Sequence, residues 1–177
     1  METGSLSLPA HGRDVAVPLP TTFERLFRTE YARVVAIAQR VLANQAEAED
    51  VAQEVFLSFY RSHPADASYA RPWLHAAAAH AALNALRTRD RRAKREGAES
   101  NAADASENDP AESAATAETQ REVRAVLARL PERSAALLAL RYSGLSYAEI
   151  AAALDVRASS IGTLLRRAEE AFRREMR

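Results

Sequence analysis

The sequence contains no cysteine, which excludes disulfide bonds, thiolate metal sites and a cysteine nucleophile, and which fits a reducing compartment. Glycine and proline are scarce, at 5 and 7 of 177 residues, whereas alanine, leucine, arginine and glutamate are common. Because these four residues favour helices, the composition predicts an all-α protein. No apolar run approaches the length of a membrane span, and residues 1–20 lack the apolar core of a secretion signal. We therefore expect a cytoplasmic protein without membrane insertion.

Net charge is also absent, because 24 basic and 24 acidic residues cancel. The charges are nevertheless segregated along the chain. Residues 21–95 hold 12 basic and 8 acidic residues, residues 96–119 hold 7 acidic and no basic residues, and residues 120–177 hold 11 basic and 7 acidic residues. The acidic segment has no large apolar residue, so it cannot bury enough surface to offset the entropy of ordering. We expect two small helical domains joined by a flexible acidic linker at 96–119, which folds back on the basic domains and competes with DNA, and a disordered tail at 1–20.

The last part of the second basic block has the spacing of a helix-turn-helix. Ser146 and Glu149 form a capping-box pattern that opens a short helix ending near Leu154, and a longer helix follows a three-residue turn. An outward face of short polar and arginine side chains suits base edges and phosphates in a major groove. The candidate DNA-contacting residues are Arg157, Ser159, Ser160, Thr163, Arg166 and Arg167. An ordinary helical hairpin with a solvated basic face is the alternative interpretation of this pattern.

A second group of candidates lies in the first block, on a helix expected from Trp73 to about Arg92. A run of six basic residues and one acid occupies residues 87–95, which suits either a phosphate-tracking surface or a solvated helix end. Aromatic and basic residues just before it could stack on unpaired bases, or could simply fill the core. His75 and His80 are five residues apart, which is the wrong spacing for a shared metal on one helix face, so we expect no metal.

Signatures of catalysis are missing from the sequence. It has no glycine loop that cradles phosphate, no Gly-x-Ser-x-Gly and no His-Glu-x-x-His motif. We therefore expect no catalytic residues, no cofactor and no enzymatic activity. An amphipathic helix that begins near Asn44 carries an acidic polar face, which could dock a protein or simply be solvated.

Taken together, these motifs resemble the sigma factors of bacterial RNA polymerase, in the sigma-70 family. Residues 50–56 (Asp-Val-Ala-Gln-Glu-Val-Phe), Trp73-Leu74 and the basic run resemble region 2. Three further segments resemble region 4, and these are Leu130-Pro131-Glu132-Arg133, residues 140–142 and residues 144–151. Two such regions with only a linker between them are typical of the extracytoplasmic-function (ECF) class.

The resemblance implies a role for each part of the chain. Residues 21–95 would be region 2, and residues 120–177 would be region 4, which would read the minus-thirty-five element as duplex. The helix with Asp50, Gln53 and Glu54 would dock on core RNA polymerase. The minus-ten element would be captured by Tyr69, Arg71, Trp73, His80, Asn84, Arg87 and Arg91. Promoter DNA and core polymerase are the implied partners, and an anti-sigma factor is a further candidate.

Three positions depart from the usual family pattern. His80 replaces a common asparagine, and Gly162 and Leu164 replace common basic residues of the recognition helix. The sequence also leaves two other functions open, which are a DNA-binding regulator that uses only the helix-turn-helix and a helical adaptor that binds only protein. Co-purification with core polymerase would discriminate among the three.

Overall fold

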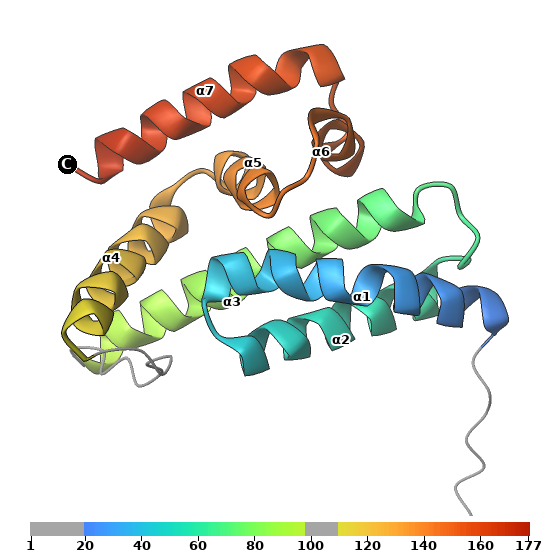
Figure 1. Ribbon diagram of the computed structural model, residues 1–177, viewed down its shortest axis with the longest axis horizontal. Coiled ribbons are helices and arrows are strands. Elements are labelled where there is room, and N and C mark those ends of the chain that lie inside the picture. The colour runs from blue at the N-terminus through green and yellow to red at the C-terminus, as the bar shows by residue number, and fades with distance from the viewer. Residues whose placement is uncertain (1–19, 98–109) are drawn as a thin grey trace, which may run out of the picture.

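The computed structural model describes residues 20–97 and 110–177, and within them it is all helical, as predicted (Figure 1). The first three helices are α1 (Thr21–Leu42), α2 (Gln45–Ser62) and α3 (Ala70–Glu96). The second half contains α4 (Pro110–Arg129), α5 (Glu132–Tyr142), α6 (Tyr147–Leu154) and α7 (Ala158–Glu175). None of the helices in these two ranges combines the length and apolar character required to cross a membrane.

Local chemistry explains where several helices begin. Asn44 caps α2, because its Oδ1 accepts a hydrogen bond of 2.8 Å from the backbone N–H of Glu47. Ser146 and Glu149 close the predicted capping box at the start of α6. Pro72 lies in the first turn of α3, where its missing N–H costs nothing.

Helix α3 is the central element of the fold. It packs against α1 and α2 on one side and against α4, α5 and α6 on the other. Its buried face contains Ala78, Ala79 and Ala82, whose small side chains allow neighbouring helices to approach closely. This explains the alanine-rich stretch, since a helix enclosed from several sides needs no single apolar stripe.

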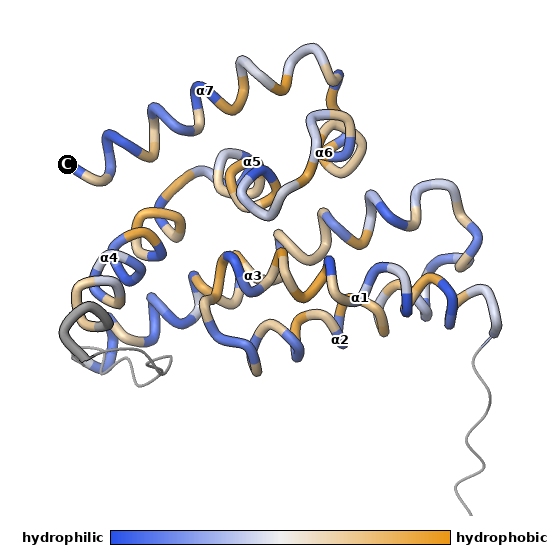
Figure 2. The backbone as a smooth tube through the Cα atoms, in the orientation of Figure 1, coloured by the Kyte–Doolittle hydropathy of each residue, from blue (hydrophilic) through white to orange (hydrophobic). Residues whose placement is uncertain are grey.

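The two halves of the chain share one hydrophobic cluster. Buried apolar side chains of α1, α2 and α3 are continuous with those of α4 to α7. The apolar positions of the helices face this interior (Figure 2). The two helical halves expected from the sequence therefore lie against each other in the structure and share this cluster.

The expected linker is partly helical. Residue 96 is the last residue of α3, and residues 110–119 form the first half of α4. The sequence failed to predict this because the segment has no apolar stripe, although alanine and glutamate favour helix. Residues 98–109 of that linker, and residues 1–19 of the expected tail, lie outside the described residues.

Candidate nucleic-acid interface

The C-terminal helices form the predicted helix-turn-helix. The residue after α6 is Asp155, whose left-handed backbone (φ 52°) turns the chain, and the N–H of Val156 bonds the carbonyl of Ala151 at 3.0 Å. Ile150 of α6 and Ile161 of α7 are fully buried and fix the two helices together. The second helix of the motif, α7, therefore has one side against the protein and one side free.

The free side of α7 carries the residues predicted to meet DNA. Ile161, Leu165 and Ala168 are buried, whereas Ser159, Thr163, Arg166 and Arg167 of the same helix are exposed, and Arg157 is its N-cap residue. Arg166 lies 3.6 Å from Glu170, an exposed pair that a phosphate could readily replace. Ser160 is half-buried, and the exposed residues are Arg157, Ser159, Thr163, Arg166 and Arg167.

Gly162 lies on this outer face, where the structure offers room for a side chain. A Cβ added there would meet only the ring of Tyr147, at an ordinary contact distance of 3.8 Å. We therefore expect Gly162→Ala to raise the free energy of unfolding by about 1 kcal/mol, because alanine favours a helix interior over glycine. Urea denaturation measures the change.

Gly144 provides the matched control for this substitution. It has φ +86°, a conformation that strains any L-residue, and it also has space around it. Gly144→Ala is expected to lower stability by about 1 kcal/mol or more. Destabilisation by Gly162→Ala would show that the neighbourhood of α7 is tighter than the structure indicates.

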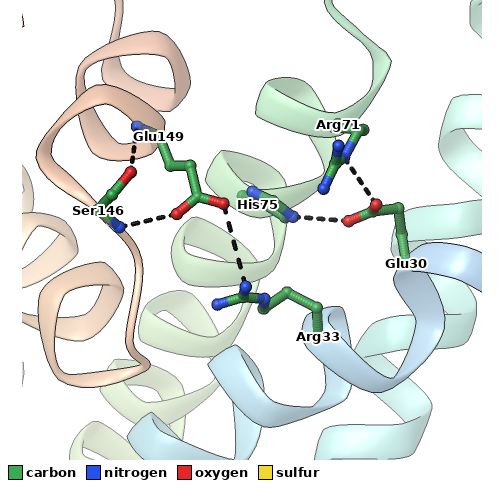
Figure 3. Close-up of polar contacts among 6 residues, drawn as sticks. All are labelled: Glu30, Arg33, Arg71, His75, Ser146 and Glu149. Atoms are coloured by element: carbon green, nitrogen blue, oxygen red, sulfur yellow. Dashed lines mark hydrogen bonds and ion pairs between the residues drawn. The ribbon is translucent and has the colours of Figure 1, made fainter.

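Glu149 connects the helix-turn-helix to the first half of the chain (Figure 3). Its Oε2 accepts the backbone N–H of Ser146 at 2.7 Å, and its Oε1 lies 4.0 Å from Arg33 of α1. The hydrogen bond from the backbone N–H of Ser146, together with the nearby charge of Arg33, lowers the pKa of Glu149 below its ordinary value. The carboxylate therefore stays ionised at neutral pH and keeps the capping box closed.

The acidic face predicted to dock a protein is open on α2. Asp50, Gln53 and Glu54 are exposed, and within the residues that the structure describes they have no hydrogen-bond or ion-pair partner. The opposite face of α2 buries Val51 and Val55 in the core. This arrangement leaves a rigid, unneutralised polar surface that a cationic partner could bind.

The first residues of the predicted minus-ten site form an aromatic cluster. Trp73 is half-buried, and its ring centroid lies 5.4 Å from that of Phe59 and 4.7 Å from that of His63. Tyr69 is 47% exposed, and its hydroxyl lies 3.3 Å from His63 Nδ1. Rings that are partly exposed and already held by aromatic neighbours can stack on an unpaired base at little cost in ordering.

Arg71, one of the predicted minus-ten residues, contacts a buried polar pair that the sequence did not predict. Its Nε lies 2.7 Å from Glu30, whose other carboxylate oxygen lies 2.9 Å from Nε2 of His75 (Figure 3). Glu30 and His75 are only 2% and 3% exposed. One signal was available: Glu30 continues the apolar stripe of Phe23 and Phe27, and a charge at such a position needs a buried partner.

Of the last four residues of the predicted minus-ten site, His80 and Arg87 contact the second half of the chain, whereas Asn84 and Arg91 are exposed. His80 Nδ1 lies 2.9 Å from Glu132 Oε1 of α5. Arg87 donates to the backbone carbonyls of Ala128 (3.3 Å) and Leu130 (3.0 Å). Asn84, Arg87 and Arg91 line an open cavity of about 370 Å³ together with Ala128. The predicted site is therefore only partly open, because His80 and Arg87 are held by α5 and by the end of α4.

Comparison with known families agrees with this geometry. Residues 26–92 match Sigma-70 region 2, and residues 120–172 match Sigma-70, region 4. The first match spans the helices that hold the aromatic cluster and the acidic face, and the second spans the helix-turn-helix. The chain therefore belongs to the sigma-70 family.

A curated relative identifies the class within that family. The chain is 29% identical over 174 residues to the ECF RNA polymerase sigma factor SigE of Mycolicibacterium smegmatis. The alignment covers 97% of this chain and 66% of the relative, so the chain spans slightly less than two thirds of that protein's length. With both regions present and in this order, the chain is a sigma-70 family protein of the ECF class.

Proposed function

We propose that the protein is a sigma factor, which binds core RNA polymerase, directs it to specific promoters and assists promoter melting at initiation. The observation that carries the proposal is the presence of both regions in one chain, each with its predicted contact surface built mostly from exposed residues. The protein contributes positioning and binding, and the polymerase performs the chemistry. A bacterial cytoplasm follows from this role.

Each part of the proposed site has a physical task. Asp50, Gln53 and Glu54 dock the core enzyme. Tyr69 and Trp73 receive unpaired bases of the minus-ten element, where stacking worth about 1–3 kcal/mol per base offsets the few kcal/mol needed to unstack one. Helix α7 reads the minus-thirty-five element as duplex. An anti-sigma factor that covers these surfaces would be the natural inhibitor.

Run-off transcription with purified core polymerase tests the proposal. Transcripts from a defined set of genomic promoters, dependent on this protein, are expected. A regulator that uses only its helix-turn-helix would bind duplex DNA without co-purifying with core polymerase. A protein that neither binds the core enzyme nor directs transcription would contradict the proposal.

The outer face of α7 allows a test of which residues read sequence. Arg166→Ala is expected to weaken duplex binding on all sequences alike and to reduce the salt-dependence slope by about 1, because we assign this side chain to a phosphate. Thr163→Ala or Ser160→Ala should instead cost about 1–3 kcal/mol on the preferred sequence and relax preference at one position. A binding panel of promoter duplexes at several salt concentrations measures both effects.

Arg133→Ala is the matched control, since Arg133 is exposed on α5 and is not one of the residues assigned to DNA contact. It should leave the binding panel unchanged. If Arg166→Ala changed sequence preference while Thr163→Ala weakened all duplexes equally, the outer face of α7 would be rotated relative to our assignment.

A further inference from the structure

A cavity of about 320 Å³ lies where four helices from both halves of the chain meet. Helix α5 lies between α1 and α7 and packs against both of them, and α4 contributes a further wall and contacts α7 (Figure 1). None of the residues that line this cavity is assigned to DNA or to core polymerase. The proposed function therefore does not account for it.

The interior of the cavity is apolar. Val41 of α1, Leu127 of α4 and Leu138 of α5 are buried in the hydrophobic cluster and line the cavity on its inner side. Val123 and Phe172 are half-buried and complete the apolar wall. Apolar side chains that face a cavity lack partner atoms on that side, so an apolar guest gains contacts there and leaves water at the same time. The volume is at the lower end of the range for small-molecule sites, about 300–1,000 Å³.

The mouth of the cavity carries a net positive charge. Its polar residues are Arg40 of α1, Tyr142 of α5, and Glu169 and Arg173 of α7. The hydroxyl of Tyr142 donates to Glu169 Oε1 at 3.4 Å, and Glu169 Oε2 lies 3.7 Å from Arg173. Arg40 is exposed and makes no hydrogen bond or ion pair with any residue that the structure describes. Two guanidinium groups thus face one carboxylate, and Arg40 is available to bind an anion.

We propose that this cavity binds a free anionic amphiphile of medium chain length, a monocarboxylate whose tail fills the apolar interior and whose head group meets Arg40 at the mouth. A guanidinium suits a carboxylate because it donates two parallel N–H bonds to the two oxygens. At about 30 Å³ for each water-sized group, the interior holds a tail of roughly ten heavy atoms, which is enough for decanoate but not for a lipid with two chains.

Binding at this place is coupled to the packing of the two halves. Because the walls come from α1 on one side and from α4, α5 and α7 on the other, the ligand binds only the packed arrangement. It should therefore stabilise that arrangement as its concentration rises. The inference goes beyond the proposed function and does not depend on it, since it needs neither DNA nor polymerase.

Isothermal titration calorimetry of the full chain with decanoate, kept below its critical micelle concentration, tests the proposal. One site per chain is expected, together with a rise in the thermal midpoint. Hexanoate should bind at least tenfold more weakly, because each CH₂ group removed from the buried tail lowers the affinity. Decyltrimethylammonium should also bind at least tenfold more weakly, because its positive head group would meet the two arginines.

Two substitutions separate the head group from the tail. Arg40→Gln should weaken decanoate binding about tenfold and leave the binding of decanol unchanged, because it removes a charged donor and no apolar wall. Ala139→Leu should abolish the binding of both, because Ala139 lines the cavity and the larger side chain occupies part of it. Arg25→Gln is the matched control: Arg25 is exposed on the same helix, about four turns before Arg40, and its loss should change neither affinity.

Several outcomes would overturn the proposal. These are an absence of decanoate binding, the binding of many equivalents per chain, equal binding of decyltrimethylammonium, or unchanged decanoate binding by the folded Arg40→Gln protein. Circular dichroism confirms the fold of each variant, and the exposed position of Arg40 makes its substitution safe for folding. Failure in this assay would leave the proposed function intact, whereas failure in run-off transcription would leave the ligand site intact.

Discussion

Replacing Glu30 by alanine is expected to lower the free energy of unfolding by about 3 kcal/mol, because it leaves His75 buried without its partner. A carboxylate accepts hydrogen bonds only, so Nε2 of His75 donates to it, and no water can take over this role without entering the core. The same change frees Arg71, which lies 2.7 Å from the other carboxylate oxygen. Urea denaturation followed by circular dichroism measures the loss.

Two substitutions sharpen this experiment. Glu24→Ala removes an acid from the same helix, but its pair with Arg28 is exposed, so it should cost less than about 1 kcal/mol. Glu30→Gln keeps an acceptor for His75 and should fall between the two. A Glu30→Ala protein as stable as the Glu24→Ala protein would show that the pair makes no net contribution to stability.

Phe59→Ala is expected to have an effect at least as large, about 3–5 kcal/mol, because the ring is fully buried and its removal leaves a cavity. The ring also supports the aromatic cluster, with its centroid 5.2 Å from that of His63 and 5.4 Å from that of Trp73. The substitution should therefore weaken single-stranded DNA binding under conditions where the protein remains folded. Calorimetry gives the stability, and fluorescence anisotropy gives the binding.

Leu57 is the matched control for this position. It is on the same helix but 46% exposed, so Leu57→Ala should change stability by less than about 0.5 kcal/mol. Phe59→Leu keeps most of the volume and should recover much of the stability while leaving Trp73 less well supported. If the folded Phe59→Ala protein bound DNA as tightly as the unsubstituted protein, the aromatic cluster would make no contribution to DNA recognition.

Much of the fold follows from local patterns. The helix expected to begin near Asn44 is α2, and the Ser146–Glu149 pair predicted the start of α6. The outward face of short polar and arginine side chains predicted which face of α7 is free. These features depend on neighbours three or four residues away, which a sequence displays directly.

Features that depend on distant residues were not predicted. The 45 residues that separate Glu30 from His75 hide their pairing, although a charge within the apolar stripe of α1 gives a warning. The acceptors of Arg87 are backbone carbonyls 41 and 43 residues away. Every residue has a backbone carbonyl, so the residue types at these positions do not indicate the contact. For the same reason the sequence could not show that the two halves meet along α3.

Helix α3 has neighbours on both sides, and this restricts how the protein can evolve. His80 and Arg87 belong to the proposed minus-ten surface and also hold α5 and the end of α4. A substitution that adapts the protein to a new promoter would therefore also alter how its two halves pack. Changes in α3 should then be accompanied by compensating changes near Glu132, so that target choice and internal packing are inherited together.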